Sequence, residues 1–345
     1  FAFFIILFAM HINNNKLSKK ILSWYDNNKR TLPWRISQKF EKKQYYRILS
    51  EFMLQQTQVK TVIPYFKNFV KKIPNLETLS KTRSRKVLKL WEGLGYYRRV
   101  KNLHKTSKIL IKKHKGNLPK EFSEIIKLPG IGDYTAKALL ALVYNESHIP
   151  FDGNVKRIFF RLFKTSLKKN EKKIRSIINK NFYTSRHGDL AEALMEFGAI
   201  ICKPINPLCK DCKLKKNCNF YKNKKLVFVN NKNHNKKYAY NIFCYLKKSK
   251  KEIALINNKN LSFLSNFKIP ETKLATSSNK KKSGWTYLCN YKNNISNIKM
   301  DINLFYKFLK NDLEKHKWYS IDRSNNEFIP TFTKNIFKKV SKVYI

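Results

Sequence analysis

The chain divides into two parts by its pattern of apolar and polar residues. From residue 16 to about residue 200, apolar residues recur three or four positions apart, which is the period of an amphipathic helix. One of these stripes follows a helix-start signal at Asp133. This part is therefore predicted to be a series of helices around a common core. The clearest stripes are Val59, Val62, Ile63, Phe66, Phe69 and Val70; Val87, Leu88, Leu90 and Trp91; Leu139, Leu140, Leu142 and Val143; and Ile174, Ile177 and Ile178.

The pattern changes at Tyr238 to short runs of aromatic and β-branched residues, which favour strands. Residues Leu304 to Leu313 have a helical pattern instead, so residues 238–345 are predicted to form a second, α+β domain. The preceding residues 221–237 are rich in Lys and Asn and are predicted to be a linker. The runs that favour strands are residues 240–246, 252–256 and 284–289.

Residues 1–15 form an apolar leader of a different kind. The stretch from Phe1 to Met10 is too short to span a bilayer, and it lacks the basic start and the cleavage site of a signal peptide. We expect translation to begin at Met10. Since no later segment has the pattern of a transmembrane helix, we expect a cytoplasmic protein.

The strong positive charge of the chain indicates the kind of molecule that it binds. The chain has 73 Lys and Arg against 22 Asp and Glu, a net charge of +51, which favours a polyanionic partner such as nucleic acid. A membrane surface, or a genomic bias towards Lys and Asn codons, are the alternatives. With 42% hydrophobic residues in 345, the chain has enough apolar side chains for two cores, which argues against disorder.

Four of the six cysteines lie in one run with spacings of six, two and five residues. Such short loops can direct four thiolates at one metal centre, either an iron–sulfur cluster or a zinc ion. Cys₄ zinc sites usually have two C-x₂-C pairs, and this run has one. Disulfides are not favoured in a reducing cytosol. The four cysteines are Cys202, Cys209, Cys212 and Cys218, while Cys244 and Cys289 are predicted to be ordinary buried thiols.

A glycine-containing turn precedes the helix that starts at Asp133. Gly130 and Gly132 permit a tight turn that leaves backbone N–H groups free at the helix N-terminus, which is a binding site for phosphate. An ordinary turn between helices is the alternative.

Two carboxyl groups are candidates for acid–base chemistry. Glu51 is flanked by apolar residues that would raise its pKa by burial, although a solvated helix glutamate is the alternative. Asp152 precedes a predicted helix, where it can be the N-cap. Cleavage of a glycosidic bond needs one neutral and one ionised carboxyl group, because the leaving group must be protonated while the sugar becomes cationic.

Several motifs together resemble those of the MutY-type adenine DNA glycosylases in the endonuclease III superfamily. They are S-E-F-M-L-Q-Q-T-Q-V at residues 50–59, the turn at 128–136, D-G-N-V at 152–155 and the cysteine run at 202–218. The resemblance covers residues 17 to about 220. It implies a mostly α helix-hairpin-helix glycosylase region (a six-helix barrel with a 4Fe–4S cluster held by the four cysteines) at residues 16–220, followed by a smaller α+β domain.

The resemblance also implies a role for each catalytic residue. Glu51 would protonate adenine at N7 and later activate water, and Asp152 would stabilise the sugar cation. Asn154 would orient these groups. Tyr134 stands where bifunctional members carry a nucleophilic lysine, which implies base removal without an efficient lyase step.

Contacts to DNA follow from the same resemblance. Gln56 would enter the gap left by the flipped adenine, and Tyr96, in the loop at 93–99, would wedge beside the opposite base. The glutamines could also be plain helix formers, and adjacent tyrosines are often core residues. The full set of implied DNA-binding residues is Arg35, Gln55, Gln56, Thr57, Tyr96, Arg99, Gly130 and Gly132.

The second domain corresponds to the Nudix-like domain that MutY-type enzymes use to recognise 8-oxoguanine. No R-E-x-x-E-E carboxylate cluster occurs in residues 238–345, so we expect recognition without phosphohydrolase activity. The Phe-Ser-His loop of the family falls at Ile295-Ser296-Asn297 and keeps only the serine, which puts a strict 8-oxoguanine preference in question.

The expected function is thus base excision repair of adenine opposite 8-oxoguanine or guanine in duplex DNA. We expect a monomer in the bacterial cytoplasm, at the nucleoid. The alternatives are an endonuclease III-like pyrimidine glycosylase with AP lyase activity, a non-catalytic DNA-binding module and a zinc-containing structural protein.

Overall fold

The computed structural model describes residues 16–35, 39–163, 176, 178, 182–222, 236–258, 261, 264, 267–275, 282–295, 298–322 and 328–344. The apolar leader, most of the predicted linker, Ile174, Ile177, Ser296 and Asn297 lie outside these residues. The chain separates into two compact units. The first is Phe1–Lys81 with Asn102–Asn230, and the second is Thr82–Lys101 with Asn231–Ile345.

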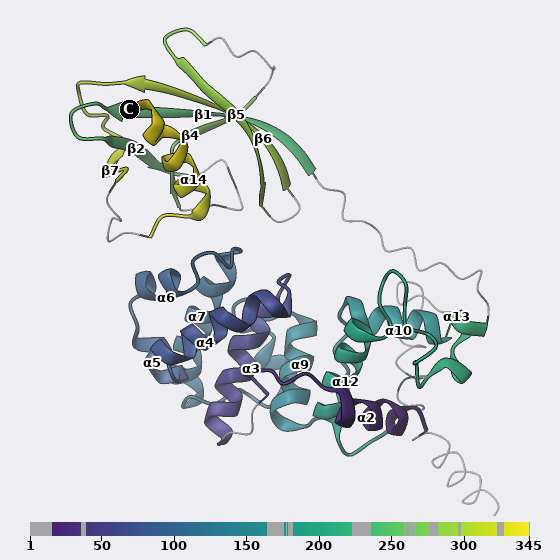
Figure 1. Ribbon diagram of the computed structural model, residues 1–345. Helices are drawn as coiled ribbons and strands as arrows, with labels where there is room; N and C mark the ends of the chain where they lie inside the picture. The colour runs from purple at the N-terminus through teal and green to yellow at the C-terminus, as the bar shows by residue number, and fades with distance from the viewer. Residues whose placement is uncertain are drawn as a thin grey trace, which may run out of the picture. The chain divides into compact units, whose positions relative to one another are not determined.

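The first unit is helical, as the periodicity predicts. Helix α12 packs against α2, α9 and α10, and α3 packs against α4 and α9 (Figure 1). The elements are α2 (Lys16–Asn28), α3 (Phe40–Leu54), α4 (Val59–Lys72), α5 (Leu76–Lys81), α8 (Phe122–Ile125), α9 (Asp133–Tyr144), α10 (Gly153–Phe163), α12 (His187–Ile200), η1 (Lys215–Asn217) and α13 (Asn219–Lys222), together with most of α7 (Arg98–His114).

Two of the predicted stripes form buried faces of helices α4 and α9. Val62, Phe66 and Phe69 of α4 are fully buried, which confirms the stripe at residues 59–70. The start signal at Asp133 is confirmed as the first residue of α9. Burial of these apolar side chains is the main term that holds the helices together.

The turn before α9 requires glycine at one of its two glycine positions. Gly130 has a φ of +83°, and a Cβ atom there would lie 2.7 Å from Asn102 Cβ and 2.8 Å from Phe52 Cε1. Gly132 has extended backbone at the N-cap of α9, and a Cβ there would meet nothing within 4 Å. The conformation and the close packing therefore both depend on Gly130.

The second unit contains a seven-stranded mixed sheet (Figure 1). Its order is β3-β2-β1-β6-β5, with β4 also paired to β1 and β7 to β2. Strands β1 and β6 are parallel, and the other pairs are antiparallel. The elements are β1 (Lys236–Lys247), β2 (Glu252–Asn257), β3 (Lys268–Ile269), β4 (Glu271–Leu274), β5 (Thr286–Ile295), β6 (Ile298–Phe308), β7 (Lys317–Ser320), α14 (Thr331–Val340) and η3 (Ser341–Tyr344), besides α6 (Ser84–Leu90).

The prediction of a helix over Leu304–Leu313 is wrong. Residues 298–308 form β6, which lies between β1 and β5. Ile302, Leu304 and Phe305 are all fully buried. A strand in the middle of a sheet carries apolar residues on both faces, and over so short a run this pattern cannot be told from that of a buried helix.

The segment Thr82–Lys101 clusters with the sheet rather than with the other helices. The ring of Tyr97 lies 5.1 Å from that of Phe267 and 4.9 Å from that of Phe328, measured between centroids. Aromatic contacts thus join this segment to the C-terminal part of the chain. Across the described residues, we find no helix with the length and apolar character needed to cross a membrane.

Close packing of α12 on the start of α10 gives a test of this fold. A Cβ atom on Gly198 would lie 2.6 Å from Asn154 Cβ and 3.1 Å from its carbonyl oxygen, so Gly198→Ala should force the helices apart. We expect a loss of about 1–3 kcal/mol in the free energy of unfolding, measured by urea denaturation. Gly153→Ala is the matched control, because a Cβ there meets nothing within 4 Å. Equal midpoints for the two variants would contradict this packing.

Candidate active site

One cavity of about 540 Å³ brings the predicted catalytic residues together. Glu51 of α3, Tyr134 of α9, Asp152 and Asn154 all line it. Its size is within the range of ordinary small-ligand pockets. The hundred residues that separate Glu51 from Asp152 along the chain are bridged by the packing of α3, α9, α10 and α12.

Glu51 lies in an environment that favours its protonated form. The side chain is buried, and this burial raises its pKa to about 7. This pKa is the net result of several effects: after burial, Arg47 has the largest effect and lowers it, Glu192 and Asp152 raise it, and a hydrogen bond from the Tyr134 hydroxyl group lowers it. Glu51 can therefore hold a proton near neutral pH, as a general acid must.

Asp152 is also partly buried at the cavity wall, and its pKa is raised above the ordinary value, but its carboxylate has several donors around it. Burial raises its pKa, but N–H donors and the Arg157 guanidinium oppose that effect. Its Oδ1 accepts the backbone N–H of Val155 at 2.7 Å, and its Oδ2 accepts the side-chain amide of Asn154 at 2.9 Å. Asp152 is thus the N-cap of α10 and, at the same time, a carboxylate at the cavity wall.

Arg157 fixes the position of the Asn154 side chain, which contacts Asp152. Its guanidinium donates to the side-chain oxygen of Asn154 at 2.8 Å, to the carbonyl of Gly198 at 2.8 Å and to the carbonyl of Cys202 at 2.7 Å. The amide that contacts Asp152 is therefore fixed in orientation and tied to the first cysteine of the run.

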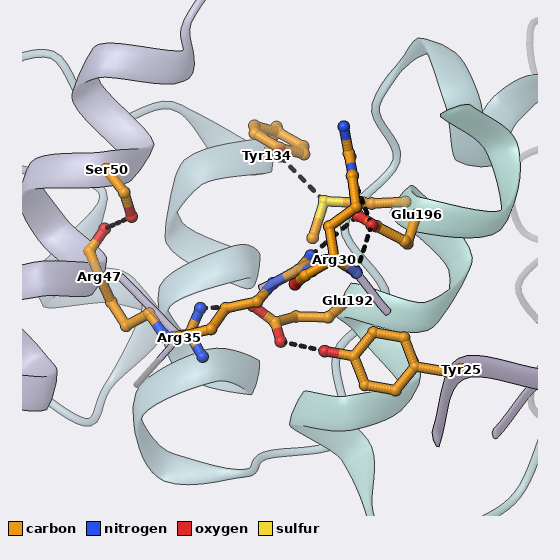
Figure 2. A network of polar contacts seen from close by, with 9 residues as sticks. Tyr25, Arg30, Arg35, Arg47, Ser50, Tyr134, Glu192 and Glu196 are labelled. Atoms are coloured by element: carbon orange, nitrogen blue, oxygen red, sulfur yellow. Dashed lines mark hydrogen bonds and ion pairs between the residues drawn. The ribbon is translucent and has the colours of Figure 1, made fainter. Parts of the chain in front are cut away.

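A buried network of ion pairs forms another wall of the cavity (Figure 2). Glu196 binds Arg30 through two N–O contacts of 2.5 and 2.8 Å, and it accepts Arg35 Nη2 at 3.1 Å. Glu192 accepts Arg47, Arg35 at 3.1 Å and the Tyr25 hydroxyl group at 2.5 Å. Pairing lowers the pKa of both glutamates against the effect of their burial, so both are anionic.

Sequence reasoning missed this network, although one signal was present. Glu192 and Glu196 lie one helical turn apart within the apolar helix α12, beside Leu194 and Phe197. Acidic residues on the buried face of a helix need partners, because an unpaired buried charge is costly. In a chain with only 22 acidic residues, that pattern marks a paired site.

The predicted DNA-contacting residues divide between the units. Arg35, Gln55, Gln56 and Thr57 line the cavity. Gln55 donates to the carbonyl of Gly130 at 3.2 Å, which connects the end of α3 to the glycine turn. Arg35 pairs with Glu192 and Glu196 and also donates to the carbonyl of Arg30 at 3.3 Å, so its described polar contacts are with the protein itself.

Tyr96 and Arg99 belong to the other unit and do not line this cavity. Arg99 is 7% exposed, donates to the carbonyl groups of Leu94 and Gly95, and stacks on Trp91 and Tyr96. The exposed arginine of this loop is Arg98. Contact of Arg99 with phosphate stays a prediction.

The four cysteines of the run line one small cavity of about 30 Å³ together with Arg161. Arg161 donates to Cys202 Sγ at 3.4 Å and to the carbonyl groups of Lys203 and Pro204. Burial raises the pKa of Cys212 to about 11, and the other thiols of the run add to this effect. Four thiolates here would need a cationic centre, which fits a cluster that binds all four.

Within the described residues, the four cysteines of this run included, no group of three or more His, Cys, Asp or Glu side chains is placed to hold a single metal ion. Cys244 is fully buried among apolar side chains, which confirms the prediction for that thiol, and Cys289 is half-buried.

The chain matches the family model of the HhH-GPD superfamily of base excision DNA repair proteins over residues 49–183. An adenine DNA glycosylase of Buchnera aphidicola subsp. Baizongia pistaciae is 41% identical over 252 residues, which cover 71% of this chain and 67% of that one. The chain belongs to the MutY-type adenine DNA glycosylase family.

Other members of this family match a smaller share of their length. The adenine DNA glycosylase of Buchnera aphidicola subsp. Acyrthosiphon pisum is 45% identical over 206 residues, 58% of each chain. The human adenine DNA glycosylase is 34% identical over 207 residues, which cover 57% of this chain and 38% of that one. The match to the first of the Buchnera relatives thus reaches two thirds of its length, and those to the other two relatives do not.

Solved structures agree on the fold of the helical unit. A thermostable thymine-DNA glycosylase is 26% identical, with a TM-score of 0.53, and the match covers 60% of this chain and 95% of that one. A trapped endonuclease III–DNA covalent intermediate has a TM-score of 0.50 at 19% identity and covers 60% and 94%. The prediction of a helix-hairpin-helix glycosylase fold for this MutY-type family member is confirmed.

The buried Glu51 gives a test that needs no DNA. Its pKa in the folded protein, about 7, is above its value in the unfolded chain, so the folded state binds more protons between these values. Its contribution to stability is therefore present at low pH and is lost as pH rises towards neutrality. Glu51→Gln should make the protein more stable than the parent at pH 8 by up to about 3 kcal/mol, with little difference at pH 5. Thermal unfolding at both pH values measures this, and an equal gain at both would contradict it.

Proposed function

We propose that the protein is an adenine DNA glycosylase of base excision repair, which hydrolyses the N-glycosidic bond of an adenine flipped out of duplex DNA. The observation that carries the proposal is the pair of carboxyl groups at one cavity, with the pKa of Glu51 raised to about 7 and the carboxylate of Asp152 held by the N–H donors of Val155 and Asn154. This is the pair that glycoside chemistry requires.

The reaction follows from these two groups. Glu51 gives its proton to N7 of adenine, and the bond between C1′ and N9 then breaks with its electron pair on the base. The carboxylate of Asp152 stabilises the cationic sugar. The Glu51 carboxylate accepts a proton from water as the hydroxyl group bonds to C1′, which restores the acid. Asn154 keeps Asp152 in place through its 2.9 Å hydrogen bond.

Tyr134 bears on what happens after the base has left. Its hydroxyl group is buried against Glu51, and its pKa is well above the ordinary value, so it stays a neutral donor. A phenol cannot form a Schiff base at C1′. The proposed enzyme is therefore monofunctional and leaves an intact abasic strand.

DNA would be held by features beside the cavity. The net charge of +51 supplies attraction to phosphate, and the Gly130 turn presents N–H groups at the start of α9. Gln56 has a φ of +57° at the end of α3, on the cavity rim, and we propose that it enters the base stack. Tyr96 would wedge the opposite strand.

The second unit would read the base opposite adenine. Its mixed sheet and its C-terminal helix α14 are compatible with a Nudix-like recognition domain that lacks a Nudix box. The proposed substrates are A:8-oxoguanine and A:G mispairs. Residues 295–297, which stand where the family has its Phe-Ser-His loop, keep only the serine. We propose a monomer that acts in the cytoplasm.

The cysteine run would hold a 4Fe–4S cluster through Cys202, Cys209, Cys212 and Cys218. When bound, the cluster would supply a structural cross-link for the loop that carries Lys203, Lys210 and Lys213. The contacts of Arg157 and Arg161 with this loop would then tie it to α10.

Activity on defined duplexes tests the function. Duplexes with A:8-oxoguanine, A:G, A:T or thymine glycol are incubated with the protein, and strand breaks are measured with and without alkali. We expect breaks at adenine in the first two duplexes, and only after alkali. Glu51→Gln should lower the rate by at least about a thousandfold while the variant still binds DNA. Processing of thymine glycol alone, or strand breaks without alkali that keep pace with base loss, would refute the proposal.

Iron and sulfide analysis tests the cluster. We expect about four iron and four sulfide ions per chain and a broad visible absorbance, both lost in Cys212→Ser. Cys289→Ser is the matched control and should keep both. Stoichiometric zinc in place of iron would contradict the cluster proposal.

A further inference from the structure

A buried ion pair lies directly behind the proposed general acid. Arg47 and Glu51 are four residues apart on α3, a spacing at which arginine and glutamate can pair across one helical turn. Within the described residues no such pair is formed. Arg47 Nη1 instead donates to Glu192 Oε1 on α12, and only 10% and 7% of these two side chains are exposed.

Arg47 also has an unused donor. Its Nε is buried and has no hydrogen-bond partner among the described residues. A buried donor without an acceptor is unfavourable, so the guanidinium would move towards another carboxyl group if Glu192 lost its charge. Glu51 is the carboxyl group that its helix offers one turn away.

Glu192 is anchored independently of Arg47. Its Oε2 accepts the Tyr25 hydroxyl group at 2.5 Å, and its Oε1 accepts Arg35 Nε at 3.1 Å (Figure 2). Arg35 is itself held by Glu196 at 3.1 Å. The carboxylate therefore stays in place on the α12 side of the cavity and draws the Arg47 guanidinium towards it.

We propose that Glu192 is a positioning residue, which neutralises Arg47 and holds it away from the Glu51 carboxyl group so that Glu51 keeps the proton it donates to the base. The inference rests on the proposed function. Among the groups that face Glu51, Arg47 is the cation, Tyr134 is a neutral donor, and Asp152 is a carboxyl group that also accepts hydrogen bonds from Val155 and Asn154. These groups are Arg47 on α3, Tyr134 on α9, Asp152 before α10 and Glu192 on α12.

Two single variants should act in opposite directions. In Glu192→Gln, Arg47 is free to pair with Glu51, so the alkaline limb of the pH–rate profile should shift to lower pH by about one pH unit or more. The rate at pH 8 should then fall about tenfold or more, with a smaller loss at pH 5. In Arg47→Met, the Glu192 charge is no longer balanced by Arg47, so the alkaline limb should shift to higher pH. The double variant Arg47→Met/Glu192→Gln should return the limb to near the parent's.

The measurement is the single-turnover rate of adenine release from an A:8-oxoguanine duplex, between about pH 5 and about pH 9. Titration of the Glu51 carboxyl carbon by ¹³C NMR, assigned with Glu51→Gln, gives the same information without DNA. If the parent releases no adenine, the proposed function fails while the NMR titration still tests the role of Glu192.

A merely structural role for Glu192 would give a different result. Glu192→Gln would then slow the reaction by the same factor at every pH and leave the Glu51 titration unchanged, which would overturn the proposal. If Glu192→Gln does not fold, the other two variants decide. An alkaline limb that fails to move up in Arg47→Met, or a double variant that stays displaced from the parent, would also overturn it.

Discussion

The central constraint on the proposed mechanism is that Glu51 must keep a proton near neutral pH inside a protein of net charge +51. Any nearby cation stabilises the anion of Glu51 and removes that proton. The cavity nevertheless contains three arginines, Arg30, Arg35 and Arg47. Glu192 and Glu196 pair with these arginines, so two of the 22 acidic residues balance positive charge at the cavity that also contains Glu51.

Helix α10 carries the second constraint, which is the orientation of Asp152. Its N-terminus supplies the N–H of Val155, and one turn later Arg157 fixes the amide of Asn154. Arg157 also binds the carbonyl group of Gly198, where α12 comes so close that only glycine fits. The position of the Asp152 carboxylate therefore depends on the close packing of α10 on α12.

Much of this was predictable from sequence where function is carried by local motifs. The segment around Glu51 and the stripe of α4 each lie within a short stretch, so periodicity and motif were sufficient. The pairing of Arg47 with Glu192 joins residues 145 positions apart, and no local pattern encodes it. The strand β6 was misread for a related reason, because its burial depends on β1 and β5, which flank it in the sheet.

Stability alone is a weak explanation of the Arg47–Glu192 ion pair. Buried ion pairs are a weak source of stability, since the desolvation of each charge offsets much of the attraction. Apolar residues at Arg47 and Glu192 could pack at least as well. They would not, however, give the site a paired charge whose balance changes when Glu51 gives up its proton. In the proposed mechanism, the pair keeps a cation within one helical turn of Glu51, where it can stabilise the anion after proton transfer, and an apolar pair offers no such cation.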